Sequence, residues 1–255
     1  MSGEMKGKVA LVTEAGSAVG QATALAFARE GARVAVTDRS EERGRRTAEL
    51  GKGAGYEFLF VPADTSRPDQ VESLICQTVD AYGALDCAVN NASFGGDLAS
   101  FAECPEELWD GVVDSNLKGT WLCMNYETRE MLHRGGGSIV NVSWGSELIG
   151  IPSYAPYVAA NYGVIGLTKS IAARCAADNI RLNVVCPGYI DTGLLEELRR
   201  ATASSEMIEI GLALVPMRRI GRPEEVARVA LWLCSHNSSY ITGQAVMVDG
   251  GRMVR

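Results

Sequence analysis

The sequence predicts an α/β fold in which a doubly wound parallel sheet of about seven strands carries helices on both faces. Short apolar runs alternate with helix-like stretches along the whole chain of 255 residues. Parallel strands need a crossover helix between them and are buried on both faces, so this alternation is typical of such a sheet. No repeat, linker or low-complexity tract interrupts the pattern, and we expect residues 1–255 to form one domain.

Each element is expected from its own pattern. The apolar runs that predict strands are 8–13, 33–38, 57–63, 85–90, 138–143, 180–186 and 245–248. The stretches with helical spacing are 19–30, 41–50, 68–82, 106–133, 154–177 and 223–234. Pro68 begins its helix at a position where proline is favoured, and Gly31 closes the first helix. Ligands of such sheets bind beyond the carboxyl ends of the strands, so functional residues are expected in the turns that follow them.

The charge balance argues against several functions. The formal net charge is −7, and Lys and Arg form no cluster along the chain. Nucleic-acid binding needs clustered basic side chains, so we expect no nucleic-acid partner. Residues 1–8 contain no apolar core and no apolar run reaches about 18 residues. We therefore expect neither a signal peptide nor a membrane span, and the cytoplasm is the default compartment.

Cysteine and histidine usage argues against a metal site. The chain has an odd number of cysteines and no C-x-x-C pair, so we expect buried thiols rather than disulfides or a zinc site. The seven are Cys76, Cys87, Cys104, Cys123, Cys175, Cys186 and Cys234. Only two histidines occur, His133 and His236, so we expect neither a His-rich metal site nor a Ser-His-Asp triad.

Motifs follow the predicted strands in a fixed order. The first turn reads T-E-A-G-S-A-V-G over residues 13–20. Later motifs are Asp38, Asp64, N-N-A at 90–92, Asn116 in N-L-K-G, N-V-S at 141–143, Tyr157, P-G at 187–188, Thr192, I-T-G-Q at 241–244 and V-D-G-G at 248–251. This series resembles the short-chain dehydrogenase/reductase family, whose members have a single Rossmann-type domain. The resemblance covers nearly the whole chain.

The resemblance implies a nicotinamide dinucleotide cofactor. Asp38 would bind the adenosine ribose hydroxyls and repel a 2′-phosphate, which favours NAD over NADP, although Asp38 could instead cap the next helix. Asp64 is expected near the adenine, Asn90 and Ala92 along the cofactor's floor, and Ile190 and Thr192 near the nicotinamide. The implied cofactor-binding set is Glu14, Gly16, Ala18, Gly20, Asp38, Asp64, Asn90, Ala92, Pro187, Gly188, Ile190 and Thr192.

The first turn departs from the family's T-G-x-x-x-G-x-G pattern. Glu14 stands at a glycine position, and Ala18 is a milder change at another. A like-charge pair at about 4 Å costs about 4 kcal/mol at an effective dielectric constant of 20, so Glu14 is expected to oppose the pyrophosphate. We therefore expect NAD(H) to bind weakly or not at all. The alternative is an exposed glutamate that turns into solvent.

The catalytic positions depart further. The family uses Asn, Ser, Tyr and Lys, of which Asn116 and Tyr157 match. Trp144 stands thirteen residues before the tyrosine, at the serine position, and Asn161 stands four residues after it, at the lysine position. Asn161 could still bind a ribose hydroxyl but carries no charge. Ser146 is a better substitute hydroxyl than Ser143, because successive side chains of a strand face opposite ways and Ser143 directly precedes Trp144. Trp144 could also be a packing residue, and Tyr157 a structural hydroxyl.

Three functions fit these departures. The reading we favour at this stage is a non-redox enzyme, an isomerase, lyase or cyclase assisted by Tyr157. The second is an NAD-dependent oxidoreductase with an atypical active site, and the third is a non-catalytic subunit or ligand-binding protein. Residues 189–216 are expected to cover the pocket. Their apolar residues suggest an apolar ligand or ordinary helix core: Leu194, Leu195, Leu198, Met207, Ile208 and Leu212. The resemblance also implies a homotetramer, with small residues in 154–177 at a helix interface.

Overall fold

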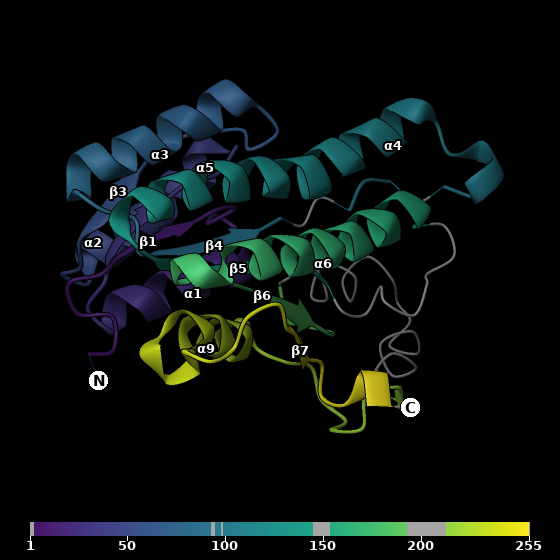
Figure 1. Ribbon diagram of the computed structural model, residues 1–255. Helices are drawn as coiled ribbons and strands as arrows, with labels where there is room; N and C mark the ends of the chain where they lie inside the picture. The colour runs from purple at the N-terminus through teal and green to yellow at the C-terminus, as the bar shows by residue number, and fades with distance from the viewer. Residues whose placement is uncertain (1–2, 93–94, 98, 145–153, 193–212, 255) are drawn as a thin grey trace.

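The fold class predicted from the sequence is confirmed. The computed structural model describes residues 3–92, 95–97, 99–144, 154–192 and 213–254. Within them, seven parallel strands pair in the order β3-β2-β1-β4-β5-β6-β7 (Figure 1). The strands are β1 Val9–Val12, β2 Arg33–Val36, β3 Phe58–Phe60, β4 Cys87–Asn91, β5 Gly137–Val142, β6 Ile180–Pro187 and β7 Ala245–Val248. The winding reverses between β1 and β4, and this switch point is where doubly wound sheets bind ligands.

The helices form a layer on each face of the sheet (Figure 1). One layer contains α1 (Ala18–Arg29), α2 (Glu41–Gly53) and α9 (Pro223–Cys234). The other contains α3 (Pro68–Tyr82), α4 (Glu106–Val113), α5 (Gly119–Arg134) and α6 (Ala155–Cys175). Each layer encloses its own apolar core against the sheet. The carboxyl ends of the strands are therefore left between two rigid layers.

The stretch predicted as one helix over 106–133 is divided. Residues Asp114–Lys118 form a π-helical turn between α4 and α5, so the hydrogen-bond register shifts by one residue there. Apolar spacing does not detect such a shift, because the helix continues in nearly the same direction. Widened turns of this kind occur frequently at functional sites. Here the turn contains Asn116, whose side chain is buried.

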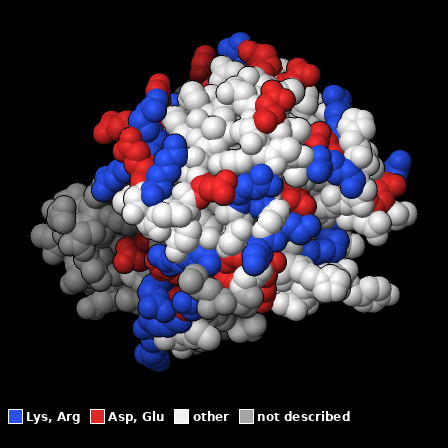
Figure 2. Space-filling view, turned by 90° about the vertical axis from the view of Figure 1, so that its left-hand side faces the viewer, with Lys and Arg blue, Asp and Glu red and all other residues white. Residues whose placement is uncertain are grey.

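The expectation for the cysteines is partly wrong. All seven thiols are free, but Cys76 is exposed and Cys104 is only partly buried. The other five are buried, and burial raises the pKa of Cys186 to about 12. No helix in the described part of the chain has the length and apolar character needed to cross a bilayer. Basic and acidic side chains are interspersed on the face seen in Figure 2, with no continuous basic patch in that view.

Candidate active site

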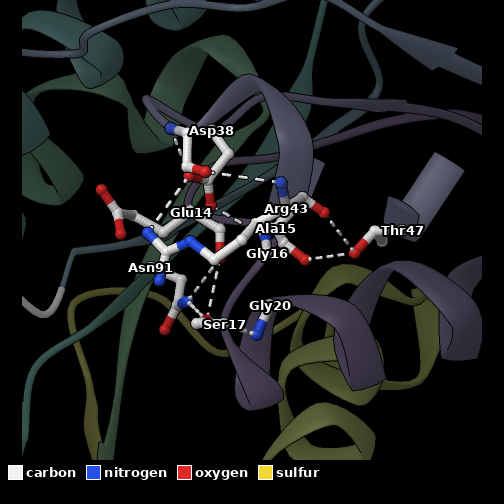
Figure 3. Close-up of polar contacts among 10 residues, drawn as sticks. Glu14, Ala15, Gly16, Ser17, Gly20, Asp38, Arg43, Thr47 and Asn91 are labelled. Carbon is white, nitrogen blue, oxygen red and sulfur yellow. Dashed lines mark hydrogen bonds and ion pairs between the residues drawn. The ribbon is translucent and has the colours of Figure 1, made fainter. Parts of the chain in front are cut away.

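The turn after β1 is held by backbone contacts that require glycine (Figure 3). Ser17 caps α1: its Oγ accepts a hydrogen bond of 3.1 Å from the N–H of Gly20 and donates one of 2.8 Å to the carbonyl of Glu14. A Cβ added to Gly20 would lie 2.3 Å from that same carbonyl oxygen. The helix can therefore approach the strand end only with glycine at this position, and α1 has no acidic residue in its first turn. A helix N-terminus of this kind favours an anionic group.

Asp38 fastens this turn to the end of β2. Its side chain is buried, and Oδ2 accepts from the N–H of Gly16 at 2.9 Å. Oδ1 accepts from the N–H of Ser40 at 2.7 Å and lies 3.4 Å from the guanidinium of Arg43. Ser40 itself is the N-cap of α2. The capping role considered for Asp38 therefore agrees with its contact at the start of α2. Its expected contact with a ribose remains a prediction.

Glu14 occupies a backbone position suited to glycine. Its φ of +49° lies in the left-handed region, which costs a non-glycine residue roughly 1–2 kcal/mol. Burial and, after it, the nearby carboxylate of Asp38 raise the pKa of Glu14 to about 7, against the opposing effects of Arg43 and Arg39. Glu14 is only partly buried by surface area. At neutral pH it is therefore divided between the neutral and charged forms.

Asn91 was not among the expected site residues, yet it connects β4 to this turn (Figure 3). Its N–H donates to Oγ1 of Thr13 at 3.0 Å, and its Nδ2 donates to Oγ of Ser17 at 2.9 Å. The side chain of Asn90, which was expected, points instead toward α5 and Glu127. Side chains alternate along a strand, and this alternation could have separated the two asparagines from the sequence.

The remaining cofactor positions lie along the same edge of the sheet. Oδ1 of Asp64 accepts hydrogen bonds from the N–H and the hydroxyl of Ser66, so it orders the turn before α3. Gly188 follows β6, and a Cβ there would lie 2.7 Å from Cα of Asp249. Ile190 is buried and pairs with Gly221 in an isolated bridge. Ala18, Ala92, Pro187 and Thr192 are among the described residues, at α1, after β4, at the end of β6 and beyond it.

The candidate catalytic residues come together at the start of α6. Tyr157 is 7% exposed and forms an edge-on contact with Tyr154, with ring centroids 6.0 Å apart. Asn161, one turn later, is also buried, and its Nδ2 donates to the carbonyl of Tyr157 at 2.9 Å. The structure also describes Asn116, whereas Ser146 and the apolar residues expected in 194–212 lie outside the described residues.

Asn161 joins α6 to the end of β5. Its Oδ1 accepts from the N–H of Trp144 at 2.9 Å and from the hydroxyl of Ser143 at 3.1 Å. Together with the Tyr157 contact, these bonds use both ends of the amide within the protein. The amide thus positions Trp144 and Tyr157, and the ribose contact considered for Asn161 stays a prediction. Ser143 faces α6, as strand alternation predicted.

The indole of Trp144 has an unused donor. The side chain is partly buried and packs against the core formed with α1 and α9. Its Nε1 is buried and has no hydrogen-bond partner in the described structure. An unpaired buried N–H is costly and calls for an acceptor supplied by a ligand or water. The packing role considered for Trp144 therefore fits its indole ring. Its N–H adds a polar group at the position where the resemblance implies serine.

Within the described residues, no group of three His, Cys, Asp or Glu side chains could hold a metal ion. The titratable and polar groups of the site instead surround the first turn and the start of α6. This arrangement suits an anionic ligand along the turn and a reacting group near Tyr157.

Comparison with known proteins agrees with this architecture. A family model described as "Enoyl-(Acyl carrier protein) reductase" matches residues 15–252. Cyclohexanol dehydrogenase of Acinetobacter sp. is 40% identical over 250 residues, covering 98% of this chain and 96% of the relative. The 3-oxoacyl-[acyl-carrier-protein] reductase FabG of Thermotoga maritima is 40% identical over 251 residues, covering 98% and 99%. The crystal structure of levodione reductase matches with a TM-score of 0.91 and 30% identity, covering 97% of this chain and 98% of that one. The chain belongs to the short-chain dehydrogenase/reductase family.

These relatives correct the functional expectation. All three are named as dehydrogenases or reductases, which indicates redox chemistry. The non-redox reading was therefore wrong, and the second reading, an oxidoreductase, fits better. Two altered residue types at catalytic positions are weaker evidence for the reaction class than the series of family motifs that surrounds them. The comparisons also give no support to weak or absent dinucleotide binding.

Proposed function

We propose that the protein is an NAD(H)-dependent oxidoreductase that interconverts a carbonyl and an alcohol on a small, largely apolar compound. The observation that carries the proposal is the network through Asn161, which holds Trp144 and Tyr157 in one hydrogen-bonded unit. That unit presents an unpaired indole N–H and belongs to the same sheet edge as the glycine-dependent turn. The names of the relatives support the reaction class.

The residues of the first turn fit a dinucleotide. Gly20 lets the N-terminus of α1 lie close to the strand end, because a Cβ there would lie 2.3 Å from the carbonyl oxygen of Glu14. Asp38, buried and fixed by the N–H of Gly16, is suited to ribose hydroxyls and unfavourable for a 2′-phosphate. When bound, the dinucleotide supplies or accepts a hydride. We expect NAD(H) to be preferred over NADP(H), and Glu14 to lower affinity without preventing binding.

The protein's own groups would handle the substrate oxygen. In reduction, Tyr157 would give its hydroxyl proton to the substrate oxygen, and in oxidation the tyrosinate would take that proton back. The Nε1–H of Trp144 can donate a hydrogen bond to that oxygen, replacing the family's serine hydroxyl as a donor but not as an acceptor. The neutral Asn161 replaces a lysine charge. Reduction, which needs the neutral phenol, is therefore expected to be favoured near pH 7.

Dinucleotide binding and turnover together test the proposal. Calorimetric titration with NAD, NADH and NADPH should show binding of NAD and NADH and weaker binding of NADPH. NADH oxidation is then followed with a panel of small ketones and aldehydes. Failure of all three dinucleotides to bind would reject the oxidoreductase, because hydride transfer has no other source.

A non-catalytic ligand-binding subunit is a second candidate, supported by the neutral amide of Asn161, which supplies no charge beside Tyr157. Such a protein would bind NADH or a small carbonyl compound without turnover. Binding of NADH with no oxidation across the panel, together with an active relative that co-purifies, would favour this candidate over the enzyme.

We also propose a homotetramer. Three large aromatic side chains, Trp109 on α4, Trp121 on α5 and Tyr162 on α6, are 40%, 43% and 51% exposed on the same helical layer. Burial of such surface between subunits is favourable, and closed symmetry is the usual outcome. Light scattering at micromolar concentration is expected to give four times the chain mass, and a monomer would contradict it. The cytoplasm remains the expected compartment, to be tested by fractionation.

A further inference from the structure

A buried carboxyl group lies against the end of β4, outside the contacts used above. Glu127 on α5 has no exposed surface, and its Oε2 accepts a hydrogen bond of 3.0 Å from Nδ2 of Asn90. Its other oxygen, Oε1, is buried and has no hydrogen-bond partner in the described structure. A buried carboxylate with an unsatisfied oxygen is costly, so the protonation state of this group needs a physical account.

The neighbouring hydrogen bonds fix the orientation of the amide of Asn90. Thr168 donates its hydroxyl to the carbonyl of Val164, so its oxygen accepts from Nδ2 of Asn141 at 2.8 Å. Oδ1 of Asn141 is then the acceptor for Nδ2 of Asn90 at 3.0 Å, across adjacent strands. Both hydrogens of that Nδ2 are thereby used, one by Asn141 and one by Glu127. The amide of Asn90 cannot be reversed without breaking this chain.

Two buried oxygen atoms remain at the pair, and both are acceptors as long as the carboxyl group is ionised. Oδ1 of Asn90 has no partner, and neither has Oε1 of Glu127. A carboxylate only accepts hydrogen bonds, whereas a carboxylic acid also donates one. A single proton on Oε1, donated to Oδ1 of Asn90, would satisfy both atoms and complete a two-way acid–amide pair.

We propose that Glu127 is the neutral acid in the folded protein and is a positioning residue, which holds Asn90 and the end of β4 beside the dinucleotide turn. Burial raises the pKa of Glu127 to about 8, against the opposing effect of the Asn90 hydrogen bond. Only burial and the Asn90 hydrogen bond shift the pKa of this carboxyl group, with no contribution from a charged neighbour. Its printed partner is neutral: Asn90 on β4, which is linked to Asn141 on β5 and through it to Thr168 on α6. The thiol of Cys123, one turn earlier on α5, is a titratable neighbour whose own pKa is raised by burial and by this carboxyl group.

The pair is joined to the proposed cofactor site through the next residue of the strand. Asn91 donates to Thr13 and Ser17 in the turn after β1. Loss of the proton would leave the oxygen of Asn90 facing a negative charge and would loosen this strand end. The positioning role rests on the proposed function, whereas the protonation state can be measured without any ligand.

Glu127→Gln is the matched variant, because a glutamine amide reproduces the neutral acid at every pH. The folded pKa of Glu127 lies above its ordinary value of 4.5, so the folded parent binds more protons than the unfolded chain. The melting temperature of the parent should therefore fall relative to that of Glu127→Gln as the pH rises from about 4.5 to about 8, and the difference should then level off. Infrared difference spectra near pH 6 should show a neutral carboxylic acid in the parent that the variant lacks.

NADH titrations near pH 6 and pH 9 test the positioning role. The parent should lose severalfold more affinity over this interval than Glu127→Gln, and Glu14, present in both proteins, contributes equally to each. Equal losses would overturn the positioning role. No NADH binding at either pH would reject the proposed function, while the melting and infrared results would still decide the protonation state. An unfolded Glu127→Gln, a variant less stable than the parent at every pH, or a parent without the acid band would overturn the neutral acid.

Discussion

Two regions at the carboxyl ends of the strands accommodate altered residues differently. One is the turn after β1, proposed to bind the dinucleotide and called here the dinucleotide half. The other is the end of β5 with the start of α6, proposed to carry the reaction and called here the reaction half. In the half proposed to bind the dinucleotide, the turn after β1 keeps its network of hydrogen bonds around one unusual side chain, Glu14. Glu14 takes part in this network through its backbone carbonyl, which accepts from the hydroxyl of Ser17, so a change of its side chain leaves that bond in place. In the reaction half, Trp144 and Asn161 form a network of their own at the end of β5 and the start of α6.

The comparison indicates that substitution disturbs less where the altered residue makes its contacts through its backbone, as Glu14 does, than where it makes them through its side chain, as Asn161 does. The turn keeps its left-handed residue although glycine is absent, at a cost in strain. The half proposed to carry the reaction contains Tyr157, and at the two positions where the resemblance implies a hydroxyl and a charge it has an indole donor and an amide. Binding is therefore expected to change modestly and catalysis substantially.

The largest effect is expected in the reaction half. Tyr157→Phe removes only the hydroxyl, and loss of general acid–base assistance typically costs about 10² to 10⁴ in rate. We expect NADH-dependent turnover to fall by that range. Tyr154→Phe is the matched control, because Tyr154 contacts Tyr157 through its ring and should lose far less activity. Turnover that is indifferent to Tyr157→Phe would place the reacting group elsewhere.

A gain of function should follow from restoring the family's residues. The double change Trp144→Ser and Asn161→Lys adds a hydroxyl and places a positive charge one turn from Tyr157. A cation favours the ionised phenol, whose ordinary pKa is about 10, so alcohol oxidation near pH 7 should increase by about 10- to 100-fold. The measurement is the pH profile of kcat for oxidation, which should shift to lower pH.

The single change Asn161→Lys separates the two contributions. Lysine cannot accept from the N–H of Trp144 or the hydroxyl of Ser143, so it should destabilise the fold by about 1–3 kcal/mol. The indole remains in place, and little activity should be gained. A single variant as active as the double variant would mean that Trp144 does not limit the reaction.

Much of this architecture could be predicted from the sequence, and the exceptions have physical causes. The strands and most helices follow from apolar spacing, and helix 68–82 begins and ends as predicted. The acceptor role of Asn161 depends on how α6 packs against β5, which spacing does not specify. Glu127 lies in the polar run E-T-R-E and would be assigned to solvent, yet α5 turns it into the core. The reaction class likewise could not be predicted from the residue types at two catalytic positions alone.

In the dinucleotide half, Glu14→Gly should tighten NADH binding at least tenfold near pH 8, which corresponds to about 1.4 kcal/mol. The pKa of Glu14 is about 7, so its charge is present above that pH and largely lost below it. The gain should therefore shrink near pH 5.5. Glu14→Gln removes the charge but keeps the side chain, and should recover most of the gain if repulsion dominates. Equal affinity of parent and Glu14→Gly at pH 8 would show that the side chain avoids the ligand.

The smallest expected effect is on stability, and it separates strain from charge at the same residue. Glu14→Gly relieves the left-handed backbone at every pH, which is worth about 1 kcal/mol. Both Glu14→Gly and Glu14→Gln remove a carboxyl group whose folded pKa is raised by burial and Asp38, so both should gain stability over the parent as the pH rises from 4.5 to about 7. Denaturant unfolding near pH 5 should then show a gain for glycine alone, and near pH 8 a gain for both variants, with glycine ahead by the same margin. A glutamine variant equal to glycine at both pH values would mean that the turn accommodates a side chain at φ +49° without strain. The dinucleotide half would then tolerate substitution even more fully than the comparison of the two halves implies.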